Sequence, residues 1–348
     1  MNLRNHFAQG HVIPAYPLAL DENRKLSEKH QRALARYYFH AGCGGLAVGV
    51  HSTQFEIREP GHALFEPVLR IASETLDAEL GDHPRDFVKI AGICGDAAQA
   101  VKEGELAVGL GYQAGLLSLT AVKERPLPEI LEHCRQVAEV LPVIGFYLQP
   151  AVGGRVFPYA FWREFMEIEN VVAVKIAPFN RYLTQDVVRA AVEAGRDDIS
   201  LYTGNDDNII VDLLTRFAFQ TPGGPKTRII DGGLLGQWGV WTRKAVLLLE
   251  EIKKARQEET LGADWLTRNA ALTDINAAVF DAANGFAGVI PGIHEVLRRQ
   301  GLLPGTWCLN PDEKLSPGQS EEIDRVARAY PDFVDDEFVR EHLHEWLK

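Results

Sequence analysis

The residue best suited to carry out chemistry is Lys175, which lies near the end of the apolar run Val171–Ala177. The run is too short for a helix and rich in β-branched residues, so it predicts a buried strand. Burial disfavours the charged ammonium and lowers its pKa, which makes a neutral, nucleophilic amine available. Such an amine can form a Schiff base with a carbonyl compound. The alternative is an ordinary lysine whose flexible stem reaches solvent, so the case depends on its neighbours.

Two other predicted strands end in residues that suit the same chemistry. One is followed by Ser52 and Thr53, whose hydroxyls and backbone N–H groups can hold a carboxylate. Another ends at Tyr147, whose phenol can relay protons beside a Schiff-base lysine. The candidate catalytic residues are therefore Lys175, Tyr147 and Ser52. Both positions also have a purely structural interpretation. The Ser52 hydroxyl could stabilise a local turn, and Tyr147 could be an aromatic residue at the edge of the fold whose hydroxyl is hydrogen-bonded within the protein.

The last two predicted strands end in segments that could contact a substrate. Gly204 would let the backbone approach a ligand, while Asn205 and Asp206 could bind substrate hydroxyls. Gly233, in the glycine-rich stretch 231–236, could expose backbone groups. Alternatively, Asn205 or Asp206 caps the N-terminus of the next helix, and the stretch around Gly233 is an ordinary turn. Together with Ser52 and Thr53, these residues form the expected substrate-binding set.

The elements that must position these residues recur along the chain. Short apolar runs alternate with helical patterns. From the second predicted strand onward the strand starts recur about every 28 residues, the length of a strand, loop, helix and loop, with a longer gap before Phe87. Eight such units predict a (β/α)8 TIM barrel, with a doubly wound open sheet as the alternative. The predicted strands are His11–Tyr16, Gly45–Val50, Phe87–Ala91, Gly115–Leu119, Val143–Tyr147, Val171–Lys175, Ile199–Thr203 and Arg228–Leu234.

After about residue 240 the strand pattern stops, and helical patterns continue to the C-terminus. We therefore expect a barrel domain over residues 1–240 and a helical appendage over residues 241–348. Residues 219–227 contain Thr-Pro-Gly-Gly-Pro and predict a loop before the last strand. The expected helices are Thr242–Glu259, Ala263–Ala283, Pro291–Gln300, Ser320–Tyr330 and Asp335–Trp346.

Composition excludes several classes of function. The chain has 348 residues, 46% hydrophobic and 24% charged, and a net charge of -12, which disfavours nucleic-acid binding. No run approaches transmembrane length, and the N-terminus lacks an apolar signal core. Four widely spaced cysteines fit a reducing cytoplasm. Eleven histidines include no HExxH, so no metal site and no cofactor are expected.

These features, in this order, resemble the dihydrodipicolinate synthase and N-acetylneuraminate lyase family of class I aldolases. The resemblance runs from about Ile13 to about residue 330. It is carried by the hydroxyl pair before Gln54, by the Tyr-x-x-Pro element at residues 147–150, by Val174-Lys175 and by residues 204–206. It implies that Lys175 forms an imine with pyruvate or another 2-keto acid, with an aldehyde as a possible second substrate. It also implies a homo-oligomer, with a tetramer expected.

Departures from the family argue against dihydrodipicolinate synthase activity itself. Gln54-Phe55 replaces the usual Gly-Glu, and the arginine expected shortly after Tyr-x-x-Pro is absent from Ala151-Val152-Gly153, although Arg155 follows. The first hypothesis is therefore an aldolase-type lyase. A 2-keto-3-deoxy sugar acid dehydratase or hydratase-aldolase using the same imine is the second. A non-catalytic keto-acid sensor is the third.

Overall fold

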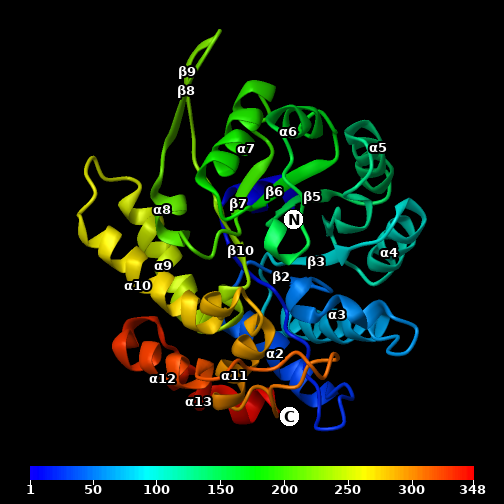
Figure 1. The fold of residues 1–348 in the computed structure, drawn as a ribbon, viewed down its shortest axis with the longest axis vertical. Helices are drawn as coiled ribbons and strands as arrows, with labels where there is room; N and C mark the ends of the chain where they lie inside the picture. Colours follow the sequence, from blue (N-terminus) through cyan, green and yellow to red (C-terminus); the bar gives the residue numbers. More distant parts are fainter. The chain divides into compact units, whose positions relative to one another are not determined.

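The computed structural model describes residues 1–348, and Figure 1 shows its ribbon. Eight parallel strands and the surrounding helices form a nearly closed (β/α)8 TIM barrel with additional C-terminal helices, which confirms the predicted fold class. The barrel strands are β1 (Val12–Pro14), β2 (Gly45–Val48), β3 (Val88–Ile93), β4 (Ala114–Leu117), β5 (Val143–Leu148), β6 (Val171–Ala177), β7 (Ser200–Thr203) and β10 (Gly232–Leu235).

The chain divides into two compact units, which are described separately. The first comprises residues 1–11 and 88–234 and contains the neighbouring parallel strands β10, β7, β6, β5, β4 and β3. Its apolar strands are buried on both faces, as parallel strands covered by helices are. Its helices are α1 (Leu3–Ala8), α4 (Ala97–Gly109), α5 (Leu127–Ala138), α6 (Tyr159–Phe165), α7 (Arg181–Ala194) and α8 (Ile209–Leu214).

The second unit comprises residues 12–87 and 235–348. The five expected C-terminal helices are all present, with ends within a few residues of the predicted ones. The boundary proposed at residue 240 stays a prediction, because the compact units divide the chain elsewhere. No helix of the chain is both long enough and apolar enough to cross a membrane. The helices of this unit are α2 (Glu28–Ala41), α3 (Phe65–Asp82), α9 (Thr242–Ala255), α10 (Asp264–Val279), α11 (Val289–Arg299), α12 (Gln319–Ala329) and α13 (Asp336–Trp346).

The segment expected to be a plain loop before the last strand is instead a hairpin. β8 (Phe217–Thr221) pairs antiparallel with β9 (Gly224–Arg228) around a Pro-Gly turn, and the hairpin is drawn in Figure 1. Gly224 adopts a φ of 103°, which suits glycine at the turn. The last barrel strand accordingly begins at Gly232 rather than at Arg228. The turn signal was correct, but the flanking residues pair with each other instead of remaining irregular.

One buried histidine of the second unit gives a prediction for stability. His294 in α11 is completely buried, and burial lowers its pKa from 6.5 to about 4. An unfolded histidine titrates near its ordinary value, so between these pH values the unfolded state binds more protons. The free energy of unfolding should therefore fall by about 3 kcal/mol as the pH drops through this range. Urea unfolding at several pH values measures it; an unchanged acid dependence in His294→Gln would contradict the assignment.

Candidate active site

The amine of Lys175 lies in an environment that favours its neutral form. The side chain is buried, with 9% of the residue exposed. Burial lowers the pKa from 10.5 to about 8, although the negative charge of Asp206 acts in the opposite direction. At neutral pH roughly a tenth of the amine is then unprotonated. A lysine at the end of a barrel strand with this pKa can attack a carbonyl carbon.

The side chain facing Lys175 from the neighbouring strand is Phe146. The two residues are partners in the parallel register of β5 and β6, so their side chains project from the same face of the sheet. The Nζ atom of Lys175 lies 4.4 Å from the centroid of the Phe146 ring. A cation at this position is attracted by the ring face. The ring would therefore stabilise a protonated imine formed on Lys175.

Because Gly204 has no side chain, the side chain of Lys175 can occupy the space beside it. A Cβ atom placed on Gly204 would lie 2.7 Å from Cε of Lys175 and 2.7 Å from Cβ of Ala177. Both separations are shorter than carbon atoms tolerate. The expected close approach of a ligand to Gly204 is thus, in this structure, a close approach of the lysine itself.

This contact predicts that Gly204→Ala lowers turnover by about 100-fold, because displacing a reacting group by about 1 Å has a cost of that order. Gly109→Ala is the matched control, since a Cβ atom there meets nothing within 4 Å. Steady-state kinetics together with melting temperatures would measure the effect. Unchanged turnover in a folded Gly204→Ala variant would show that the amine does not need this position.

Tyr147 does not lie where the sequence suggested. Its hydroxyl donates to the Phe157 carbonyl and accepts from the Phe157 N–H, both at 3.2 Å, and its ring packs 4.9 Å from that of Trp162. It is completely buried, and burial raises its pKa to about 12. Because adjacent residues of a strand face opposite sides, Tyr147 points away from the face that carries Phe146 and Lys175.

A register shift between β5 and β6 explains this placement. Val143 pairs with Val171, but Ile144 pairs with Ala173, so Val172 is an extra residue. Uninterrupted pairing from Val143 would have placed Tyr147 opposite Lys175. A shift of one residue exchanges the faces. The expected tyrosine–lysine pair is therefore replaced by a phenylalanine–lysine pair.

Asn205 is also used by the fold rather than presented to a ligand. It is completely buried, and its Nδ2 donates to Thr184 Oγ1 at 3.2 Å and to Asp212 Oδ2 at 2.9 Å. Its Oδ1 accepts from the Phe179 N–H at 2.9 Å. These bonds hold the loop after β7, and a contact of Asn205 with substrate hydroxyls stays a prediction. Asp206, the next residue, is the one whose charge acts on Lys175.

Gly233 lies within β10 and takes part in the sheet. Its Cα is the register partner of Thr203 on β7, and its N–H donates to the His11 carbonyl at 3.1 Å. The backbone donor that sequence analysis expected to meet a substrate is therefore engaged within the barrel wall.

Ser52 and Thr53 belong to the second unit, in a 3-10 turn after β2. The Thr53 hydroxyl accepts from the N–H groups of Gly49 and Val50 at 3.0 and 3.2 Å and donates to the Tyr16 carbonyl at 2.6 Å. Its single proton is donated to Tyr16, so the hydroxyl holds the loop, and the carboxylate contact of this segment stays a prediction. Ser52 is buried beside it, with 4% exposed.

The residue after this hydroxyl pair shows how the loop tolerates its departure from the resembled family. Gln54 has a φ of 68°, a conformation that favours glycine, the residue expected there. Its Oε1 accepts from the Leu309 N–H at 2.6 Å. This hydrogen bond from the C-terminal region of the same unit helps to hold Gln54 in a backbone conformation that glycine adopts more easily.

Phe146 also lines a small hollow. Its lining includes Thr120, Lys123 and Arg155. Two cationic side chains that sequence analysis did not bring together therefore lie beside it. The guanidinium of Arg155 donates to the carbonyls of Lys123 and Arg125. The Lys123 amine donates to the Gly153 carbonyl at 3.3 Å. Arg155 is thereby held to the loop after β4.

Comparisons with known proteins bear on the fold. No protein-family model matches the sequence, and no curated protein matches it. Among solved structures, an N-acetylneuraminate lyase from Fusobacterium nucleatum complexed with pyruvate has 19% identity and a TM-score of 0.71, covering 95% of this chain and 99% of its own.

Two further structures agree with this result. A dihydrodipicolinate synthase from Bacteroides thetaiotaomicron has 16% identity and a TM-score of 0.72, covering 92% of this chain and 98% of its own. A prophage protein of the dihydrodipicolinic acid synthase family from E. coli K12, in complex with pyruvate, has 16% identity and a TM-score of 0.73, covering 93% and 98%. The chain therefore has the barrel fold of the N-acetylneuraminate lyases and dihydrodipicolinate synthases over nearly its whole length.

Proposed function

We propose that this protein is a class I lyase that acts on pyruvate or another 2-keto acid through a Schiff base on Lys175. The observation that carries the proposal is the buried amine of Lys175, whose pKa of about 8 leaves part of it neutral near physiological pH. The fold supports it, because similar barrels include lyases and proteins complexed with pyruvate. No metal or organic cofactor is required, since the imine itself supplies the electrophile.

The reaction proceeds through a carbinolamine, a protonated imine and an enamine. The neutral Lys175 amine adds to C2 of the keto acid and gives a carbinolamine. Loss of water from this adduct leaves a protonated imine, whose positive charge faces the Phe146 ring. In the cleavage direction the C4 hydroxyl loses its proton, the C3–C4 bond breaks, the C4 fragment leaves as an aldehyde, and the electron pair of that bond moves into the imine to give an enamine. Protonation at C3 and hydrolysis by water release the keto acid and restore the amine. In the condensation direction C3 loses a proton to give the same enamine, which then attacks the aldehyde carbon.

Asp206 is the group we assign to proton transfer in place of Tyr147. Its carboxylate is buried, with 7% exposed, and is close enough to raise the pKa of Lys175. A carboxylate there can accept the proton that leaves the attacking amine and return it to the departing hydroxyl. The phenol of Tyr147, bonded to the Phe157 backbone, is assigned to the barrel wall instead. Ser52 remains our proposed partner for the keto-acid carboxylate.

A dehydratase of 2-keto-3-deoxy sugar acids, or a hydratase-aldolase, is the second candidate, because the same enamine can expel a hydroxyl. The loop after β5 supports this second candidate. Pro150–Val152 form a 3-10 turn that ends at Gly153, and this turn lacks the arginine that binds a distal carboxylate in the synthase. The altered loop changes which distal group is accepted, whereas the imine chemistry is unaffected.

Product analysis over a panel of 2-keto acids, aldehydes and 2-keto-3-deoxy sugar acids tests these candidates. An aldolase releases pyruvate and an aldehyde, whereas a simple dehydratase retains all the carbon atoms in one product. Saturable keto-acid binding without turnover and without an imine would instead support a sensor and would overturn the proposal. Turnover that disappears in Lys175→Ala would exclude the sensor.

We expect little or no dihydrodipicolinate synthase activity. That reaction requires a positioned cation for a second carboxylate, and Arg155 instead donates to two backbone carbonyls. An unpaired carboxylate in a pocket costs several kcal/mol, or about three orders of magnitude in rate. A coupled assay with pyruvate and aspartate semialdehyde measures it. Turnover of roughly ten per second would show that Arg155 or Lys123 supplies the cation.

A homotetramer is also proposed, on the resemblance to the family. Sedimentation at micromolar protein concentration checks it, and a stable monomer would contradict it.

A further inference from the structure

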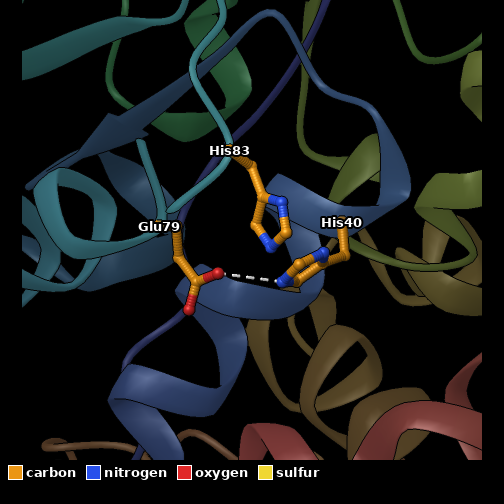
Figure 2. A group of neighbouring side chains, drawn as sticks. All are labelled: His40, Glu79 and His83. Atoms are coloured by element: carbon orange, nitrogen blue, oxygen red, sulfur yellow. Dashed lines mark hydrogen bonds and ion pairs between the residues drawn. The ribbon is translucent and has the colours of Figure 1, made fainter. Parts of the chain in front are cut away.

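Two imidazoles and one carboxylate from separate parts of the second unit converge at the packed ends of α2 and α3 (Figure 2). His40 lies in the last turn of α2, Glu79 lies in the last turn of α3, and His83 follows α3 directly. The three potential ligand atoms all lie within 4.8 Å of one another. Figure 2 shows the three side chains directed toward a common point, with the Glu79 carboxylate bonded to His40.

Two of the three side chains are close enough for one metal ion to bind both. His40 Nε2 lies 2.9 Å from Glu79 Oε2. Two ligand atoms that are each about 2.1 Å from a tetrahedral metal ion lie about 3.4 Å apart, so a small separation of these two side chains admits the ion. His83 is exposed, so its side chain can rotate to close the third position. Its ring lies edge-on to that of His40, with centroids 5.6 Å apart.

Groups around the three residues hold two of them in place. The second carboxylate oxygen of Glu79 lies 3.3 Å from the Arg36 guanidinium, so Oε2 is left to face the imidazoles. The Trp346 ring stacks on His40, with centroids 6.2 Å apart and planes 16° apart. Partners that orient the ligands are typical of metal centres. Arg36 also adds a positive charge, which weakens the attraction for a cation.

We propose that His40, Glu79 and His83 form a binding site for a divalent transition metal ion of the Zn²⁺ or Co²⁺ class. Two imidazoles and a carboxylate are ligands that such ions prefer, whereas Mg²⁺ and Ca²⁺ prefer oxygen ligands alone. Water completes the coordination, because the site is partly exposed. On binding, His40 changes tautomer so that the Nε2 proton is released to solvent and Nδ1 carries the remaining proton; the Nε2 lone pair then binds the ion and the hydrogen bond to Glu79 is lost. The ion links α2 to α3 and takes no part in the proposed imine chemistry.

Titration of the chelator-treated full-length protein with Co²⁺, followed by its visible d–d absorption, tests the proposal. We expect saturable binding of one ion, displaced by Zn²⁺, with affinity at least about tenfold lower in His83→Ala and in Glu79→Gln. His62→Ala is the matched control, since His62 is an exposed histidine of the same unit outside the cluster. Zn²⁺ should also raise the melting temperature of wild type and His62→Ala, but not of His83→Ala.

Equal Co²⁺ affinity in wild type and His83→Ala would mean adventitious surface binding only and would overturn the site. The absence of saturable binding would overturn it as well. His83 is exposed, so its replacement leaves the core intact and a negative result cannot be attributed to misfolding.

Discussion

Replacing Lys175 by alanine will lower lyase turnover by at least about four orders of magnitude, a loss of rate typical for removal of a covalent nucleophile. No other amine can form the imine at this position, and without the imine no electron sink exists at C2. The removed side chain is largely buried against Phe146 and Gly204, so the variant also loses packing. Steady-state kinetics with the best substrate of the panel would measure the loss.

Lys175→Met separates chemistry from packing, because methionine fills a similar volume without an amine. Lys89→Met is a further control, since Lys89 is another buried lysine, on β3. We expect the first variant to be as inactive as Lys175→Ala and the second to retain turnover. A folded Lys175→Met enzyme with more than a few per cent of wild-type activity would place the nucleophile elsewhere.

The second large effect is expected at Asp206. Asp206→Asn should reduce turnover by about 10²- to 10⁴-fold, the usual contribution of a positioned acid–base group. The same change should lower the pKa of Lys175 below its present value of about 8, because the carboxylate charge now favours the ammonium. More of the amine is then neutral at pH 7. The variant should therefore form the imine with a lower pH midpoint, while the proton transfers that make and dehydrate the carbinolamine, and with them turnover, become slower.

The pH dependence of imine formation separates these roles. The borohydride-trapped fraction after a short exposure to pyruvate should rise with pH through a midpoint near 8 in the wild type, and through a lower midpoint in Asp206→Asn. An unchanged midpoint would remove the electrostatic link between the two residues. An unchanged turnover would remove the acid–base role and leave Asp206 as a neighbouring charge only.

The sequence was most informative where local patterns repeat. The spacing of buried strands near 28 residues identified the barrel, and helical periodicity located the five C-terminal helices. Lys175 stood out because an ammonium at the end of an apolar strand is chemically unusual, and its burial and lowered pKa agree with that interpretation. These inferences depend on residues close together in the chain, where periodicity and burial are directly coupled.

The sequence was least informative where a partner from another part of the chain decides the outcome. The extra residue at Val172 moves Tyr147 to the other face, and nothing in the run of valines marks it. The hydroxyl of Thr53 is satisfied by Tyr16, and Asn205 by Thr184 and Asp212. Such hydrogen bonds are set by tertiary packing.

The same limit applies to the proposed metal site. His40 and Glu79 are far apart in the sequence, and only Glu79 and His83 have a spacing that places both on one side of a helix. No local motif reveals such a cluster, because α2 and α3 must first pack together. The sequence-based expectation of no metal relied on contiguous motifs alone.

The central claim is that Lys175 forms a covalent imine with a 2-keto acid, and borohydride trapping with pyruvate tests it most directly. Reduction should add one reduced pyruvate per chain in the intact mass, and peptide mapping should place it on Lys175. Lys89→Met should be labelled as fully as the wild type, and Lys175→Met should not be labelled. No adduct across the keto-acid panel, or an adduct that survives in Lys175→Met, would contradict the account.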